Sequence, residues 1–400
     1  MADPPGFRVF SAPGRTELAG NHTDHNNGKV LAAAIQLQIT AHAQKTDDNT
    51  VYFCSAGFPD VKFKLTDNKG KFDLQARPEE TGTTQAIIRG IAAELNKRGC
   101  AIGGFSANAE SGVLPGFGLS SSAAAETLIV RIFDSLYADG KLSAVETAQI
   151  GQIAENAYFG KPCGLMDQIA CAAGGAVSID FADSANPIVK KINFNPAEAG
   201  YILCVVNTGE SHADLTADYA SIPAEMKSAA AFFGKSVLRE IDKETLLSRA
   251  EDIIKTLGDR ALLRAIHFFD ENARVDSMTS LLIEMENASS AADKQAAFYK
   301  YLDLVNESGN SSRDFLQNTF SPDNPKSQGI GIALALTNDF LHKRKLPGAC
   351  RVHGGGFAGA IQAYIPKDAM DSYRINMEAV FGTGAVTELK IKLEGAGEIK

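Results

Sequence analysis

The spacing of apolar residues divides the chain into short strands and longer helices. Alternating or continuous apolar runs predict strands over residues 7–10, 30–43, 102–111, 174–181 and 201–207, and a hairpin over 51–65. Apolar residues at helical spacing predict helices over 82–98, 121–137 and 143–158. Residues 222–320 are rich in Ala, Leu, Glu and Lys and are expected to be mostly helical, whereas the remainder returns to a mixed pattern. The pattern therefore predicts a mixed α/β fold.

The length of the chain predicts two domains. It has 400 residues, and single hydrophobic cores rarely grow past about 250–300 residues. The segment 182–187 reads Ala-Asp-Ser-Ala-Asn-Pro, a cluster of turn-forming residues. We therefore expect an N-terminal domain over residues 1–185 and a C-terminal domain over residues 186–400.

Composition and charge argue against nucleic acid and membranes as binding partners. The formal net charge is −9, and no run of five Lys or Arg residues is present, which does not favour binding to nucleic acid. The six cysteines form no CxxC pair, which is typical of free thiols in a reducing compartment. No basic and apolar leader is visible, and the apolar runs are too short to span a bilayer. These features predict a cytoplasmic protein without a membrane partner.

A glycine- and serine-rich segment precedes the helix expected from residue 121. Residues 114–124 read Leu-Pro-Gly-Phe-Gly-Leu-Ser-Ser-Ser-Ala-Ala. Glycines let backbone N–H groups approach a ligand, and a helix N-terminus attracts anions. The segment therefore predicts a phosphate cradle, although a loop with a single serine N-cap is the alternative. It is not a P-loop, and the Gly-Lys-Ser at 234–236 lacks the glycine that this motif needs at Ala229.

A second glycine run, residues 354–359, formally matches a dinucleotide-binding fingerprint. That fingerprint should open a helix. Here the glycines lead into residues 360–365, which are expected to form a strand. The run therefore does not favour a dehydrogenase, and it predicts a close approach of backbone to a ligand or to the other domain.

Two polar segments complete the candidate site. Residues 12–28 contain Arg, Asn, His and Asp, which hydrogen-bond sugar hydroxyls, although the segment taken alone is more typical of a solvated loop. Residues 160–168 place Asp167 between a Pro/Gly turn and an apolar run. An acid in this position is either a helix cap or a functional group with a perturbed pKa.

In this order the four segments resemble the motifs of the GHMP kinase superfamily and, within it, the galactokinase family. Residues 14–28 resemble G-R-x-N-L-I-G-E-H-T-D-Y-N-x-G, and residues 114–124 are similar to P-x-G-x-G-L-S-S-S-A-A. Residues 162–168 resemble P-C-G-x-M-D-Q, and residues 354–359 resemble G-G-G-F-G-G. The resemblance covers nearly the whole chain. It implies a two-domain α/β (α+β) GHMP kinase fold with the active site in the cleft between the domains. The N-terminal domain would resemble ribosomal protein S5 domain 2, and the C-terminal domain would be ferredoxin-like with added helices.

The same resemblance implies an activity and a set of site residues. A cytoplasmic monomer would use ATP and Mg²⁺ to phosphorylate the anomeric hydroxyl of galactose, giving galactose 1-phosphate and ADP. Asp167 and Arg15 would be catalytic, and Ser121 and Glu155 would hold the metal. The residues implied in nucleotide binding are Pro115, Gly116, Gly118, Leu119, Ser120, Ser121, Ser122 and Ala123. The residues implied in sugar binding are Arg15, Asn21, His22, Asp24, Gly164, Asp167 and Tyr219.

Position 21 departs from the family pattern, and it leaves the substrate open. Asn21 stands where the family has a glutamate that contacts the 6-hydroxyl of galactose. The loss of a charged hydrogen bond would cost about 1.5–3 kcal/mol. The loss of that charge also admits galacturonate or another galactose-like sugar as the alternative substrate. A silent sugar sensor is a further alternative, but the segment 120–124, Arg15 and Asp167 are intact. Kinases of mevalonate or homoserine lack the segments 22–24 and 166–168.

Overall fold

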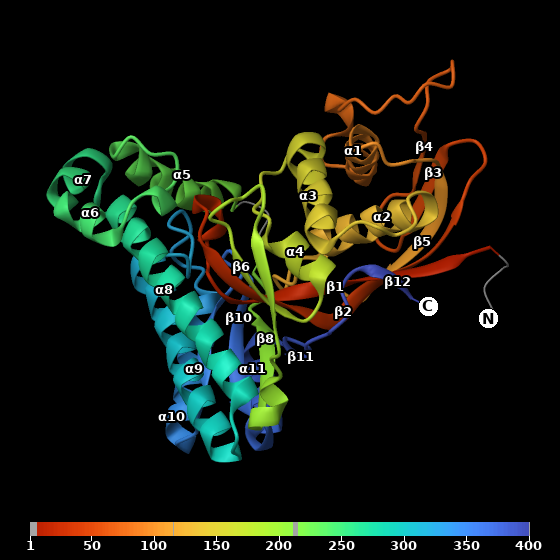
Figure 1. The fold of residues 1–400 in the computed structure, drawn as a ribbon. Helices are drawn as coiled ribbons and strands as arrows, with labels where there is room; N and C mark the ends of the chain where they lie inside the picture. Colours follow the sequence, from red (N-terminus) through yellow and green to blue (C-terminus); the bar gives the residue numbers. More distant parts are fainter. Residues whose placement is uncertain (1–5, 115, 211–214, 400) are drawn as a thin grey trace.

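The computed structural model describes residues 6–114, 116–210 and 215–399, and its strands form two sheets (Figure 1). The larger sheet has the order β12-β1-β2-β5-β3-β4, with β6 beside the first half of β2 and β7 beside β6. Its strands are β1 (Arg8–Ala19), β2 (Lys29–Lys45), β3 (Thr50–Ser55), β4 (Val61–Lys64), β5 (Phe105–Ser111), β6 (Ala176–Asp180), β7 (Ile188–Ile192) and β12 (Gly397–Ile399).

The smaller sheet is antiparallel and has the order β11-β8-β10-β9. Its strands are β8 (Tyr201–Asn207), β9 (Ala349–His353), β10 (Ala360–Pro366) and β11 (Val386–Leu389). The glycine run 354–359 connects β9 to β10. The expectation that this run leads into a strand, and not into a helix, is therefore confirmed.

Helices cover both sheets, and most follow the apolar spacing. In the first half of the chain they are α1 (Thr84–Lys97), α2 (Ser121–Tyr137), α3 (Ala144–Ala154) and α4 (Met166–Ala173). In the second half they are α5 (Thr216–Phe232), α6 (Lys243–Ser248), α7 (Ala250–Leu257), α8 (Asp259–Asn287), α9 (Ala291–Ser311), α10 (Gly329–Arg344) and α11 (Met370–Phe381). The region expected to be helical thus holds α5 to α9. The α-helix expected over 143–158 ends earlier, at Ala154, and a π-helical turn follows over 155–159.

One long hydrophobic cluster joins the helices to the sheets. α2 and α4 pack on β1 and β2, and α8 and α9 pack on each other and reach β1. Phe10 and Leu31 of the larger sheet belong to the same buried cluster as Phe298 and Tyr301 of α9. Burying this apolar surface fixes the position of α8 and α9 against the larger sheet.

The boundary expected near residue 185 lies in the turn between β6 and β7. These two strands pair antiparallel, with Ala176 opposite Ile192. β12, near the end of the chain, also pairs with β1. Two strands that follow residue 185 in the sequence are therefore part of the larger sheet.

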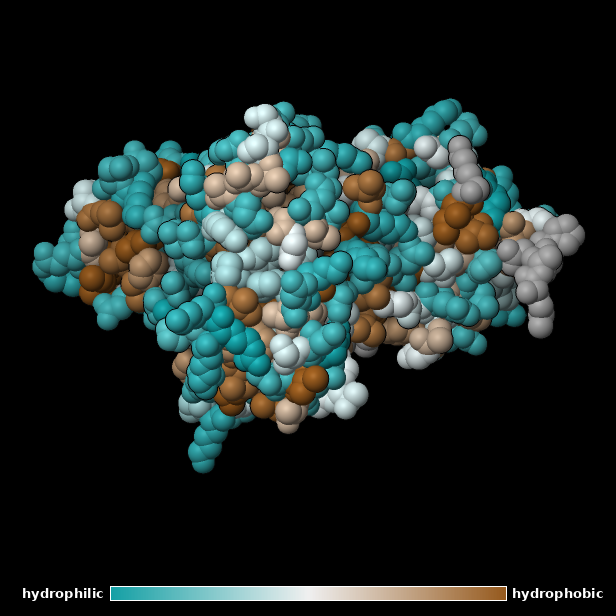
Figure 2. Space-filling model, turned by 90° about the horizontal axis from the view of Figure 1, so that it is seen from below, coloured by the Kyte–Doolittle hydropathy of each residue, from teal (hydrophilic) through white to brown (hydrophobic). Residues whose placement is uncertain are grey.

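The surface seen in Figure 2 is largely hydrophilic. Apolar side chains gather at its left end, where α6 and α7 expose Leu247 and Ile254. Among the described residues, no helix is both long and apolar enough to cross a membrane. The six cysteines are free thiols, as their spacing predicts.

The first strand is much longer than its apolar pattern indicates. A strand was expected over 7–10 only, but β1 continues to Ala19, and residues 11–21 are buried. The interpretation of residues 12–28 as a solvated loop is therefore wrong. The polar side chains are buried because distant segments supply partners: Thr16 Oγ1 lies 3.0 Å from His353 Nε2, and Glu17 accepts a hydrogen bond from Arg351.

Candidate active site

Arg15 and Asp167 form a bidentate ion pair at the centre of the predicted site. Arg15 Nε donates to Asp167 Oδ1 at 2.7 Å, and Nη2 donates to Oδ2 at 2.8 Å. The remaining nitrogen, Nη1, donates to the carbonyl of Gly118 at 2.5 Å. A bulge in β1 between Pro13 and Arg15 turns the arginine toward the loop before α2. The pair therefore joins residues 14–28, called the sugar motif below, to the glycine–serine loop and to α4.

The two members of this pair differ in exposure. The side chain of Arg15 is 6% exposed, whereas that of Asp167 is 33% exposed. Burial acts to raise the pKa of Asp167, but the charge and hydrogen bonds of Arg15 outweigh it and hold that pKa below its ordinary value. Asp167 is thus ionised at neutral pH, and part of its carboxylate is open to a ligand. Because it is tied to Arg15, it is more than a helix cap of α4.

The glycine–serine loop runs into the N-terminus of α2 beside this pair. Gly116 and Gly118 have φ of 81° and 68°, which glycine adopts without strain. Ser120 occupies the N-cap position of α2 but makes no side-chain capping bond, and its hydroxyl donates to Asp167 instead. The alternative of an ordinary serine cap therefore does not describe Ser120.

The other nucleotide residues expected in this loop differ in accessibility. Ser121 is half-buried at the first position of α2, and Ser122 is exposed. The side chains of Leu119 and Ala123 are buried in the main hydrophobic cluster, so only their backbones are available to a ligand. Pro115 lies outside the described residues.

A second buried cluster contains Glu155, which was predicted to hold the metal. Gln168 Nε2 donates to Glu155 Oε2 at 3.1 Å and to Glu126 Oε2 at 2.9 Å. Lys161 Nζ lies 3.4 Å from Glu155 Oε1. Burial first, and then the charge of Glu155, raise the pKa of Glu126 well above its usual range. Neither Glu126 nor Gln168 was predicted as a site residue, although an acid within the apolar pattern of 121–137 is a signal that could have indicated Glu126.

The glycine run 354–359, called the third motif below, accepts hydrogen bonds from side chains of the sugar motif and of α5. Asn21 Nδ2 donates to the carbonyl oxygen of Gly354 at 2.7 Å, and His22 Nε2 lies 3.0 Å from the carbonyl oxygen of Gly355. The hydroxyl group of Tyr219 donates to the carbonyl oxygen of Gly356 at 3.0 Å. Asn21 Oδ1 accepts from Asn318 at 2.9 Å. Burial lowers the pKa of His22 to about 3, so its ring is neutral.

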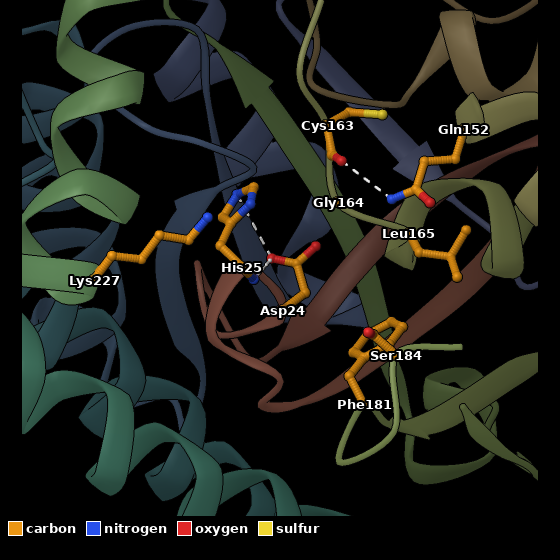
Figure 3. A pocket seen from close by; sticks show the side chains of 9 residues that line it. All are labelled: Asp24, His25, Gln152, Cys163, Gly164, Leu165, Phe181, Ser184 and Lys227. Carbon is orange, nitrogen blue, oxygen red and sulfur yellow. Dashed lines mark hydrogen bonds and ion pairs between the residues drawn. The ribbon is translucent and has the colours of Figure 1, made fainter. Parts of the chain in front are cut away.

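Asp24 and Gly164 line a cavity of about 280 Å³ (Figure 3). A Cβ at Gly164 would overlap the carboxylate of Asp24, so these two residues are in close contact. His25 Nε2 lies 3.6 Å from Asp24 Oδ1, and Figure 3 shows Lys227 of α5 pointing toward His25. Among the described residues, the lining includes neither Arg15 nor Asp167; the latter is connected to it through the segment 164–167.

α8 supports the backbone of the sugar motif from the other side. Glu271 Oε1 accepts a hydrogen bond from Gly20 N at 3.0 Å, and His267 Nε2 lies 2.9 Å from the carbonyl oxygen of Asn21. Burial would raise the pKa of Glu271, but the charge of Arg274 and of other neighbours lowers it to about 2. Local sequence gave no sign that this helix reaches the sugar motif.

Comparisons with known proteins identify the family of the chain. Residues 86–175 match the family "GHMP kinases N terminal domain", and residues 2–45 match the "Galactokinase galactose-binding signature". A galactokinase of Glaesserella parasuis serovar 5 (strain SH0165) is 31% identical over 368 residues, which cover 91% of this chain and 86% of the relative. Two crystal structures share the fold. Lactococcus lactis galactokinase complexed with galactose has a TM-score of 0.80 and 23% identity, covering 99% of this chain and 96% of that one. Methanococcus jannaschii mevalonate kinase has a TM-score of 0.60 and 14% identity, covering 97% and 99%.

The fold and the four motifs define a GHMP kinase. Within this class the relative from Glaesserella is similar along most of the chain. The chain therefore belongs to the galactokinase family, and the family resemblance and fold class predicted from the sequence are confirmed.

Proposed function

We propose that the protein transfers the γ-phosphoryl group of ATP to the anomeric hydroxyl of galactose, giving galactose 1-phosphate and ADP. The observation that carries this proposal is the Arg15–Asp167 pair, held at the N-terminus of α2 beside the glycine–serine loop. Membership of the galactokinase family supports the choice of substrate and nucleotide. A cytoplasmic location and a monomeric state stay predictions of the sequence.

The pair suits phosphoryl transfer because little covalent chemistry is required of the protein. The anomeric oxygen forms a bond to the γ-phosphorus, and the bond from that phosphorus to the bridging oxygen of ADP breaks. Asp167 accepts a hydrogen bond from the hydroxyl and directs its lone pair toward phosphorus. Because its pKa is lowered, Asp167 is a weak base, so the hydroxyl proton passes to its carboxylate only late in the reaction. Arg15 stabilises charge on the transferring oxygens.

The phosphates would lie along the glycine–serine loop and the N-terminus of α2, where free N–H groups and the helix dipole favour anions. Ser121 and Glu155 would hold Mg²⁺, which prefers oxygen ligands. The residues fit this ion because Glu155 is a buried carboxylate whose neighbour Glu126 has an unpartnered oxygen. When bound, Mg²⁺ neutralises charge on the β- and γ-phosphates.

The sugar would lie between Asp24, Gly164 and Asp167, with His22 and Tyr219 at the third motif. Asn21 is 1% exposed, and its amide nitrogen already donates to Gly354 and Glu17. It therefore has no spare hydrogen for the carboxylate of galacturonate. This favours galactose over the alternative substrate, and it reduces the direct role expected of Asn21 in sugar binding.

A coupled ADP-release assay with MgATP tests the proposal on galactose, galacturonate, N-acetylgalactosamine and glucose, with Asp167→Ala as the control. We expect galactose to be turned over fastest and Asp167→Ala to be inactive. Faster turnover of galacturonate would refute the substrate and keep the chemistry, and Asn21→Glu should then abolish it by adding a like charge. If no sugar releases ADP, the kinase proposal fails and the sugar-sensor alternative replaces it.

A further inference from the structure

The cluster around Glu155 contains more hydrogen-bond acceptors than donors. The amide nitrogen of Gln168 carries two hydrogens but faces three acceptors: Glu126 Oε2, Glu155 Oε2 and, at 3.6 Å, the sulfur of Cys163. Within the part of the chain that the structure describes, Glu126 Oε1 and the amide oxygen of Gln168 are buried and have no hydrogen-bond partner. Buried polar atoms are normally satisfied, so these two oxygens point to a ligand that supplies positive charge or donors.

Three separate elements fix these side chains. Glu126 lies in the second turn of α2, Glu155 begins the π-helical turn after α3, and Gln168 lies in the first turn of α4. α3 makes room for Glu126 at Gly151, where a Cβ would lie 3.1 Å from Glu126 Cβ and 3.3 Å from its Oε2. π-helical turns occur often at functional sites, where they redirect a side chain.

The cluster also lies next to the reacting groups. Gln168 follows Asp167 directly in the sequence, and Glu126 lies on the helix whose N-terminus faces the phosphate loop. Glu126 Oε2 and Glu155 Oε2 both lie within hydrogen-bond distance of Gln168 Nε2, at 2.9 Å and 3.1 Å, so the two carboxylates are close to each other. Two carboxylates this close repel each other unless positive charge or a proton lies nearby. Lys161 Nζ lies 3.4 Å from Glu155 Oε1, but its side chain is 62% exposed, so water screens its charge, and in the part of the chain that the structure describes it forms no ion pair with Glu126. Mg²⁺ keeps several of its waters when it is bound to a protein, and such waters supply the donors that the cluster lacks.

We propose that Glu126 is a second acidic residue of the divalent-cation site, where its Oε1 accepts a hydrogen bond from a water on the ion that Glu155 binds. Gln168 is a positioning residue that holds the two carboxylates on the same side of the ion. This inference rests on the proposed use of MgATP. A single proton shared by the two carboxylates, with no contact to the ion, is the competing explanation.

Mn²⁺ in place of Mg²⁺ provides a test that does not depend on turnover. Electron paramagnetic resonance measures Mn²⁺ binding to the protein with a non-hydrolysable ATP analogue and galactose. Loss of a partner outside the metal ligands typically weakens metal affinity about 10–100-fold. We expect Glu126→Gln to raise the Kd for Mn²⁺ by about tenfold or more and to change the signal of the bound ion. Glu155→Gln should weaken binding further.

Asp134→Asn is the matched control, because Asp134 is a buried acid at the other end of α2 that pairs with Arg131. It should leave the Kd for Mn²⁺ unchanged. If Glu126→Gln also binds Mn²⁺ like wild type while Glu155→Gln does not, this inference is overturned and the proposed metal site stands. If Glu155→Gln binds normally as well, both fail. Should Glu126→Gln not fold, Gln168→Met takes its place, and normal Mn²⁺ binding by that variant would overturn the inference in the same way.

Discussion

Replacing Asp167 by asparagine keeps the size of the side chain but removes the negative charge that faces Arg15. In the folded protein two of the three hydrogen bonds from the Arg15 guanidinium end on this carboxylate. An asparagine can accept only one of them, and its amide group then points a donor at Arg15. The variant therefore leaves a buried cation without its partner, which is one of the few single changes with a large effect on stability.

The structure sets the size of this effect. Breaking a buried ion pair by removing one partner costs about 3–5 kcal/mol. The side chain of Asp167 is 33% exposed, and Arg15 keeps its bond to Gly118, so we expect the lower end, about 3 kcal/mol. Arg15→Met should cost about 2–3 kcal/mol. The double variant should cost less than the two together, with a coupling energy of about 2 kcal/mol.

Urea unfolding at pH 7 without ligands measures these free energies. The chain has no tryptophan, so far-UV circular dichroism is a suitable signal. Asp180→Asn is the matched control, because the arginine that Asp180 pairs with, Arg239, is 28% exposed and can be solvated, whereas Arg15 is 6% exposed; we expect a cost of about 1 kcal/mol or less. Both single variants at the site should also lower kcat by about 100-fold or more. The reasoning is refuted if Asp167→Asn costs no more stability than Asp180→Asn, or if the two substitutions at the site are additive.

Three further predictions concern other parts of the site. Gly164→Ala should raise the KM for galactose about tenfold or more and leave the KM for ATP unchanged, because a Cβ would displace the carboxylate of Asp24; equal changes in both KM values in steady-state assays would contradict this. Gly118→Ala should raise the KM for ATP and cost about 1–2 kcal/mol in urea unfolding, since φ is 68°. Gly140→Ala, also at 68° but with only an ordinary contact of 3.6 Å to Ser135 Oγ, should show only the stability loss. Glu271→Gln should be less stable than wild type at pH 7. Its native carboxyl has a depressed pKa of about 2, so its stabilisation is complete above the unfolded pKa of about 4.3 and is lost as the pH falls toward 2. The difference in urea midpoint between the two proteins should therefore narrow from pH 5 to pH 3, and a constant difference would show that the charge of Glu271 does not stabilise the fold.

Much of the secondary structure could be predicted because its signals are local. The limits of α2 and of α1 follow from apolar spacing and differ from the prediction by at most two residues. The strand after the glycine run 354–359 was also predicted from neighbouring residues. The family was recognised from short motifs whose order along the chain is a property of the sequence alone.

The prediction was wrong for the second half of β1, and the reason is physical. Residues 15–17 are polar, so hydropathy places them in solvent. They are buried because distant residues supply their hydrogen-bond partners: Arg351 and His353 lie more than 300 residues from Glu17 and Thr16, and Asp167 lies 152 residues from Arg15. A pattern read along the chain contains no information about such partners. For the same reason the sequence did not predict that α8 contacts the sugar motif, where Glu271 accepts a hydrogen bond from Gly20 N.

The sequence by itself determined the fold class, the family and the residue types available for phosphoryl transfer, since motifs and apolar periodicity are local. Only the tertiary structure decided which of these residues act on one another. It joined Arg15 to Asp167 across 152 positions and directed Ser120 to Asp167 and not to a helix cap. It also placed Glu126 beside Glu155. Hydrogen bonds and charge interactions depend on distances in space, and chain folding sets these distances only when the whole core packs.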